Sequence, residues 1–128
     1  MRSKSYTIKV KPIAWQRAAR NGSRYFDAQA KDKLAHGLYL TNQHGDEPLF
    51  DKTIEIDITF FMAIPKTVGD RQISIHHSKS PDLDNLIKFL LDAIKDVLIT
   101  DDRIIWKIHA RKYYDKNPRT ELTIAEVS

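Results

Sequence analysis

The spacing of apolar residues divides the chain into segments of different predicted secondary structure. Residues 53–61 alternate apolar and polar side chains, which predicts a strand. Residues 83–98 repeat apolar side chains at helical spacing and carry charges on the opposite face, which predicts an amphipathic helix. The runs 103–114 and 120–125 predict two more strands. On its buried face, the strand at 53–61 would carry four apolar residues: Ile54, Ile56, Ile58 and Phe60.

The N-terminal part of the chain is less regular. Residues 5–10 predict a strand of mixed polarity, and residues 14–23 predict a loop. A helix is predicted over residues 27–42, with Asp27 as its N-cap, and residues 65–81 predict a surface connection that has room for a short irregular helix. The predicted helix is defined by the spacing of six apolar residues: Ala28, Ala30, Leu34, Ala35, Leu38 and Leu40.

Taken in order, these segments predict an α+β fold in which two helices pack on a mixed sheet, as a single domain over residues 1–128. The chain has 128 residues, 41% of them hydrophobic and 30% charged, which suits one buried core. It has no apolar run near 18 residues, and its start alternates like a strand rather than a secretory segment. We therefore expect a cytoplasmic protein with no membrane span.

Charge is distributed unevenly along the chain, whose net charge is +4. Residues 1–33 hold nine Lys and Arg against Asp27 and Asp32, a net charge of +7, whereas the rest of the chain sums to −3. A basic N-terminal quarter on a weakly acidic body favours a polyanion-binding surface. The chain has no cysteine, which excludes disulfides, thiolate metal sites and a cysteine nucleophile, so catalysis would use oxygen, imidazole or amine groups.

Four aspartates are the strongest candidates for chemistry. Asp82 and Asp84 begin the helix predicted at 83–98, and Asp101 and Asp102 follow its end. A hard divalent cation such as Mg²⁺ prefers carboxylate oxygens and water, and it can polarise a phosphodiester and lower the pKa of an attacking water. Lys88 lies one helical turn after Asp84 on the same face, from which its ammonium can reach a phosphate.

Structural roles explain the same residues without any chemistry. An aspartate at a helix N-terminus stabilises the helix by about 0.5–1 kcal/mol, and the later aspartate pair fits a turn. Lys88 fits a solvated ion pair with Asp84 that contributes about 0.3 kcal/mol. A calcium-binding EF-hand is excluded, because Leu86 and Ile87 stand where its loop requires an oxygen ligand and a glycine.

The segment PDLDNLIKFLLDAI at residues 81–94, followed by DDRII at 101–105, resembles the signature of RusA-type Holliday junction resolvases. The similarity extends more weakly over most of the chain. The resemblance implies an α+β homodimer in which Mg²⁺ or Mn²⁺ supports paired nicking of four-way DNA junctions during recombination and repair. The same resemblance implies roles for individual residues: metal-site Asp82, Asp84 and Asp102, with Asp101 as the fallback ligand, and catalytic Lys88.

Helix length restricts how these residues meet. A helix of about 15 residues spans about 22 Å, so Asp102 cannot reach Asp82 from the far end of the same helix. The three aspartates meet only if Asp102 comes from a partner subunit or if the chain doubles back after Ile94. For the dimer, residues 54–61 and 104–114 are the candidate shared surfaces, because two helices leave part of a sheet uncovered.

The basic N-terminal loop suits DNA, since it combines cationic and aromatic groups for phosphate contacts and base stacking. A basic solvated loop with Trp15 packed in the core explains it equally well. His76 and His77 fit either phosphate contacts or an ordinary surface. Two rival functions also stay open: a non-catalytic DNA-binding or recombination accessory protein with this fold, and a structural domain without a nucleic acid partner. The residues expected to bind DNA are Lys11, Arg17, Arg20, Arg24 and Lys79.

Overall fold

The computed structural model describes residues 1–17, 19–22, 24–66 and 74–127, with residues 19–21 and 24–26 described by their backbone alone. Four strands form one mixed sheet in the order β1-β6-β4-β5. Strand β6 is antiparallel to both of its neighbours, whereas β4 and β5 run parallel. The strands of this sheet are β1 (Ser3–Ile8), β4 (Ile54–Ala63), β5 (Ile105–Asp115) and β6 (Arg119–Glu126).

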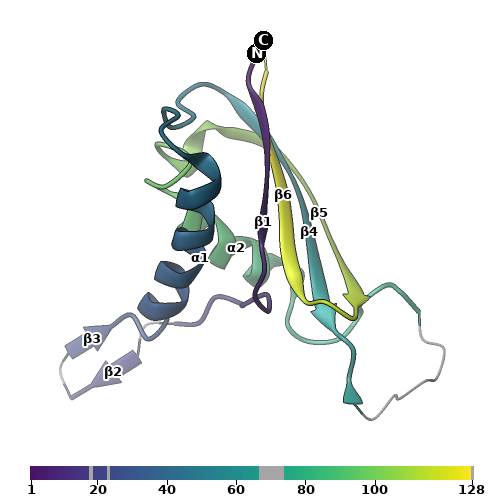
Figure 1. The fold of residues 1–128 in the computed structure, drawn as a ribbon. Coiled ribbons are helices and arrows are strands. Elements are labelled where there is room, and N and C mark those ends of the chain that lie inside the picture. The colour runs from purple at the N-terminus through teal and green to yellow at the C-terminus, as the bar shows by residue number, and fades with distance from the viewer. Residues whose placement is uncertain (18, 23, 67–73, 128) are drawn as a thin grey trace.

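Two helices, α1 (Ala30–His44) and α2 (Leu83–Ile94), lie on one face of this sheet and leave the other face open (Figure 1). The predicted α+β fold with two helices on a mixed sheet is therefore confirmed. Among the described residues, no helix has the length and apolar character needed to cross a bilayer.

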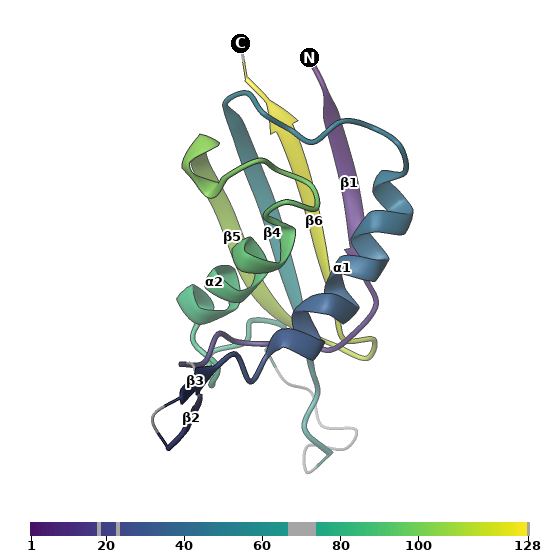
Figure 2. The same cartoon turned by 90° about the vertical axis from the view of Figure 1, so that its left-hand side faces the viewer.

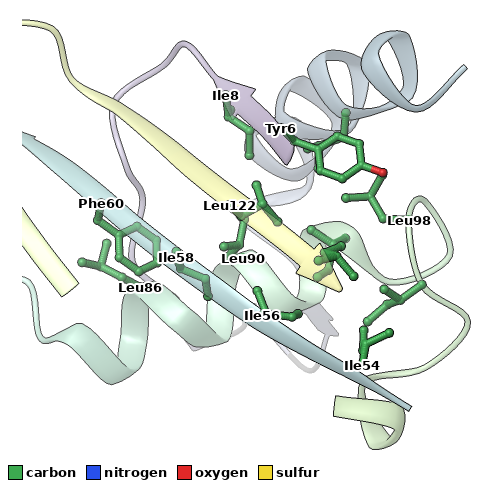
Figure 3. Close-up of a cluster of buried hydrophobic side chains, with 14 of the residues drawn as sticks. Tyr6, Ile8, Ile54, Ile56, Ile58, Phe60, Leu86, Leu90, Leu98 and Leu122 are labelled. Atoms are coloured by element: carbon green, nitrogen blue, oxygen red, sulfur yellow. The ribbon is translucent and has the colours of Figure 1, made fainter. Parts of the chain in front are cut away.

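The core lies between β4 and α2. The alternation predicted for β4 is confirmed, because Ile54, Ile56, Ile58 and Phe60 are all buried. Figure 3 shows Phe60 beside Leu86 and Ile58 beside Leu90 of α2, with Ile54 farther along β4. Burying each such side chain stabilises the fold by about 1.5–3 kcal/mol, which fixes α2 against the sheet.

Helix α2 lies over β5 and β4 (Figure 2), and different parts of the chain hold its two ends. At the N-terminal end of the helix, the Lys112 ammonium of β5 donates to the carbonyls of Lys79 and Pro81, at 2.7 Å each. At the C-terminal end, the Phe50 N–H donates to the Leu98 carbonyl at 2.8 Å. The chain then passes through a 3₁₀ turn, η2 (Asp102–Ile104), into the start of β5.

The predicted loop at residues 14–23 is partly wrong. Its second half contains β2 (Ala19–Asn21), which pairs with β3 (Arg24–Phe26) in a small antiparallel hairpin. Gly22 lies at the turn with φ +66°, a conformation that glycine adopts without steric cost. The predicted surface connection at 65–81 includes residues 67–73, which lie outside the described residues.

The first helix differs from its prediction in its start and in its buried face. Its N-cap is Gln29, and Asp27 acts two residues earlier by accepting the Gln29 N–H at 2.9 Å. Leu34 and Leu38, two of the apolar residues whose spacing predicts the helix, are 67% and 61% exposed. The buried residues of this helix are His36, Leu40 and His44.

Histidines are buried on α1 because their ring nitrogens have partners. The Tyr6 hydroxyl lies 2.6 Å from His44 Nδ1, and His44 Nε2 lies 3.1 Å from the Pro48 carbonyl. Burial raises the pKa of Tyr6 to about 12, so its hydroxyl keeps the proton that it donates to His44. His36 Nδ1 donates to the Asp32 carbonyl at 3.0 Å, and its ring packs edge-on against Phe89.

The second helix ends earlier than predicted, at Ile94 rather than near Leu98. Lys95 is extended and Asp96 has φ +63°, so the chain turns at this point. Leu98 is still fully buried, but it reaches the core from the turn.

Candidate active site

The N-terminal end of α2 presents two exposed carboxylates. Asp82 occupies the N-cap position, but within the described residues its side chain makes no capping hydrogen bond. Asp84 is exposed in the first turn, where its Oδ1 accepts the Asn85 N–H at 2.9 Å. The capping role that sequence allows for Asp82 is therefore not made by its carboxylate, which is left to face solvent.

The chain leading into Asp82 is held by β5. Besides the Lys112 bonds to residues 79 and 81, the His77 N–H donates to the Lys112 carbonyl at 3.1 Å. The Tyr114 N–H donates to the Ile75 carbonyl at 2.8 Å, so residues 75–77 pair with the edge of β5. These bonds fix the backbone before the helix, and none of them involves the side chains of Asp82 and Asp84.

Lys88 lies on the same helix but does not pair with Asp84. No ion pair between described residues joins the two, and the Lys88 ammonium instead lies 3.5 Å from the centroid of the Trp15 ring. A cation–π contact at an exposed site contributes about 0.5–1 kcal/mol, against about 0.2–0.5 kcal/mol for a helical ion pair at this spacing. The aromatic contact is therefore the stronger of the two for this ammonium.

The second acidic pair lies beyond the other end of α2. The Asp101 carboxylate caps η2 by accepting the Arg103 N–H at 3.0 Å. This bond, followed by a hydrogen bond with Asp102, holds the pKa of Asp101 below its usual range. Asp102 itself is exposed, so it is the member of the pair whose carboxylate faces solvent.

One chain does not bring the predicted metal ligands together. Asp82, Asp84 and Lys88 belong to the N-terminal end of α2, a helix of 12 residues that is about 18 Å long, whereas Asp102 belongs to η2, which follows the other end of the helix in the chain. Across the described ranges, no three His, Asp or Glu side chains are close enough to hold a metal ion. The chemistry of the donors fits a hard divalent cation, because they are carboxylate oxygens, but one chain supplies only two of them at one place.

The predicted DNA-binding residues occupy several segments. Lys11, Arg17 and Lys79 are exposed. Arg20 and Arg24 lie in the β2–β3 hairpin, beside the start of α1 (Figures 1 and 2), and their side chains are outside the described part of the structure.

The two histidines before α2 have different environments. His76 is exposed, beside the hydroxyl of Ser74 and the ring of Tyr113. His77 is half-buried against the Tyr114 ring, and its Nδ1 has no hydrogen-bond partner among the described residues. Burial, and then the charge of Lys112, lowers the pKa of His77, which keeps it neutral near pH 7.

Sequence reasoning missed the roles of three residues that shape this site. These are Trp15, which contacts Lys88, and also Gln29 and Lys112. Lys112 belongs to a strand in which charged and aromatic residues mix, so nothing in its spacing distinguishes it. Gln29 carries a weak signal, since a polar residue at a helix N-cap is ordinary.

Comparison with known proteins identifies the class to which this fold and site belong. The family described as endodeoxyribonuclease RusA matches residues 8–125. The chain therefore belongs to the RusA endodeoxyribonuclease family, and membership supports a nuclease of the Holliday junction resolvase type. A curated relative, "Uncharacterized protein YqaN" of Bacillus subtilis (strain 168), is 26% identical over 136 aligned residues that cover 96% of each chain.

Proposed function

We propose that this chain is a divalent-metal-dependent endodeoxyribonuclease that resolves four-way DNA junctions by paired nicks, as a homodimer acting in recombination and repair. The observation that carries this proposal is the pair of exposed carboxylates, Asp82 and Asp84, in the same region as Lys88 at the N-terminal end of α2, in a member of the RusA family.

Each residue has a defined role in this proposal. Asp82 and Asp84 hold Mg²⁺ or Mn²⁺, which when bound polarises the scissile phosphate and lowers the pKa of the attacking water. Lys88 directs its ammonium at the phosphate oxygens on which negative charge increases in the transition state. The ammonium remains protonated throughout, so Lys88 stabilises charge rather than transferring a proton.

The third metal ligand is Asp102 of a partner subunit. After Ile94 the chain turns toward the start of β5, and no three possible metal ligands gather among the described residues, which supports the partner as the source. Asp102 is preferred to Asp101, because the Asp101 carboxylate is already used to cap η2. Asp101 is the fallback.

The edge of the sheet supports a dimer that brings these ligands together. Strand β4 lies between β6 and β5, and α2 covers its apolar face, so it is a poor candidate for the shared surface. Strand β5 is an edge strand, and it exposes Trp106, at 61%, near its start. The later part of this edge already pairs with residues 75–77, so a two-fold axis beside the strand would set the start of one β5 against residues 75–77 of its partner, and Asp102 near the N-terminal end of the partner's α2.

DNA binding completes the proposal. Lys11, Arg17, Arg20, Arg24 and Lys79 contact phosphates, and two-fold symmetry presents two equivalent sites to strands of like polarity.

Cleavage of a synthetic four-way junction tests this proposal. We expect nicks at symmetric positions with Mg²⁺ or Mn²⁺ and none with a chelator. Binding without cleavage in any divalent metal would favour an accessory DNA-binding protein. Failure to shift the junction at physiological salt would favour a structural domain.

A further inference from the structure

We infer that Trp15, held in place by Gln29, is a positioning residue that keeps the Lys88 ammonium off Asp84. The contacts that carry this inference are made within one chain. Their consequence for cleavage rests on the function proposed above.

Trp15 touches α2 in two places. Its backbone N–H donates to the backbone carbonyl of Asn85 at 2.9 Å, and the centroid of its ring lies 3.5 Å from the Lys88 Nζ. Residues 85 and 88 are about one helical turn apart, so the backbone bond and the ring contact share one helix face. The indole is therefore oriented toward Lys88 by its own backbone.

Gln29 fixes the segment that carries Trp15. Its Oε1 accepts the Gln16 N–H at 2.9 Å, and its Nε2 donates to the Ala14 carbonyl at 2.8 Å. These bonds bracket Trp15 on both sides, and Gln29 is only 5% exposed. A buried amide with both ends satisfied is costly to displace, so it holds the segment in a single position.

The alternative partner of Lys88 is Asp84. An aspartate four residues before a lysine is the favourable order for a helical ion pair, yet within the described residues this pair is not formed. If Lys88 turned onto Asp84, it would occupy an oxygen proposed to bind metal and would withdraw the ammonium from the phosphate. The Trp15 ring keeps both groups available.

Lysine methylene signals in the metal-free, full-length protein test this contact directly. Protons above an aromatic ring are shielded, so we expect the Lys88 ε-CH₂ signal, identified by its loss in Lys88→Arg, to lie upfield of the other lysines. Trp15→Leu should return it to their position, and Trp15→Phe should keep part of the shift. An unchanged Lys88 signal in Trp15→Leu would overturn the contact. Trp15→Phe decides the question if the leucine variant does not fold.

Gln43 provides a matched control for Gln29. It also bonds a backbone segment twice, accepting the Thr7 N–H at 2.8 Å and donating to the Thr7 carbonyl at 2.6 Å, but it is far from Lys88 in the sequence and on the other end of α1. We expect Gln29→Ala to reduce the upfield shift and Gln43→Ala to leave it intact. Equal responses in the two variants would overturn the role of Gln29.

Cleavage kinetics test the consequence separately. Trp15→Leu should lower the single-turnover rate about tenfold while the junction Kd stays within about twofold, and Trp15→Phe should recover most of the rate. A loss confined to Kd would make Trp15 a DNA contact and contradict its positioning role. If the unmodified protein does not cleave in any metal, the proposed function fails, while the methylene signals still decide the contact.

Discussion

The two ends of α2 are built differently, although a pair of aspartates lies at its start and another pair follows its end in the chain. At the N-terminal end, the backbone is held from outside by Lys112 and Trp15, and the carboxylates of Asp82 and Asp84 face solvent. At the C-terminal end, Leu98 and Ile99 are fully buried, and Asp101 is used as a cap. Only Asp102 remains available there.

This contrast indicates which acidic residues the fold needs and which it does not. A carboxylate that stabilises its own backbone, like that of Asp101, has a structural reason to be present. The Asp84 carboxylate accepts one such local bond through its Oδ1, from the Asn85 N–H, and the carboxylates of Asp82 and Asp102 face solvent. The three residues do not gather closely enough in one chain to hold one metal ion. The comparison therefore leads to the proposal of a site shared between two copies.

The largest expected effect is the loss of junction cleavage, and we expect a similar loss when the proposed metal ligand is changed on either side of α2. Asp84→Asn and Asp102→Asn should each lower junction cleavage by about a thousandfold or more, because each removes a proposed metal ligand. Junction binding in chelator should persist. Asp92→Asn is the matched control, since Asp92 is also exposed on α2 and only approaches Lys33, at 3.9 Å. Near-normal cleavage by Asp102→Asn would separate the two ends and remove Asp102 from the site.

The next effect concerns Lys88 alone. Lys88→Ala should lower the single-turnover rate by about a hundredfold with little change in junction affinity, because its charge acts mainly in the transition state. Rapid-quench cleavage and gel-shift titrations of the same variant measure the two quantities. If affinity falls and the rate at saturation does not, Lys88 only positions a phosphate.

Stability should separate the two members of the second acidic pair. Asp101→Ala should lower the melting temperature, because the Arg103 N–H loses its acceptor, and it should retain cleavage. Asp102→Ala should leave the melting temperature near that of the unmodified chain. Thermal unfolding in chelator measures both, and loss of cleavage in Asp101→Ala at a temperature where it is folded would favour the fallback ligand.

The smallest effect lies between the two ends, where α1 packs on α2. Burial lowers the pKa of His36 below its ordinary value of about 6.5, so the folded state resists protonation that the unfolded chain accepts. The free energy of unfolding should therefore fall as the pH drops below about 6.5 toward the folded-state pKa. Denaturation at pH 7.5, 6.5 and 5.5 should show this slope, and His36→Gln should flatten it. An equal slope in that variant would assign the pH dependence to other groups.

Hydrophobic periodicity predicted the elements that are buried on one regular face. The strands β4 and β6 and the start of α2 agree with their predictions, because apolar burial determines their spacing. Strand β5 also forms where it was predicted, although it has no regularly buried face. Periodicity also predicted the helix α1, but not all of its buried residues, because polar partners allow His36 and His44 to be buried there beside Leu40. It also missed the β2–β3 hairpin, which is too short to show a period.

The candidate site shows a similar division. The acidic and basic residues are visible in the sequence, because helix boundaries and residue types identify them. The contacts of Lys88 with Trp15, and of Gln29 with residues 14 and 16, join segments that periodicity does not relate. Whether Asp102 meets Asp82 also depends on the path after Ile94, which residue spacing leaves open.

The most direct test of a shared site mixes two inactive proteins. Asp84→Asn and Asp102→Asn subunits are combined, exchanged under mild denaturant and checked for mixed dimers by native mass spectrometry. If Asp102 acts in the partner's site, each mixed dimer contains one site with both substitutions and one intact site. The mixture should then nick a four-way junction on one strand with Mg²⁺, although neither protein does so alone. Mixed dimers that form but do not nick would contradict the shared site.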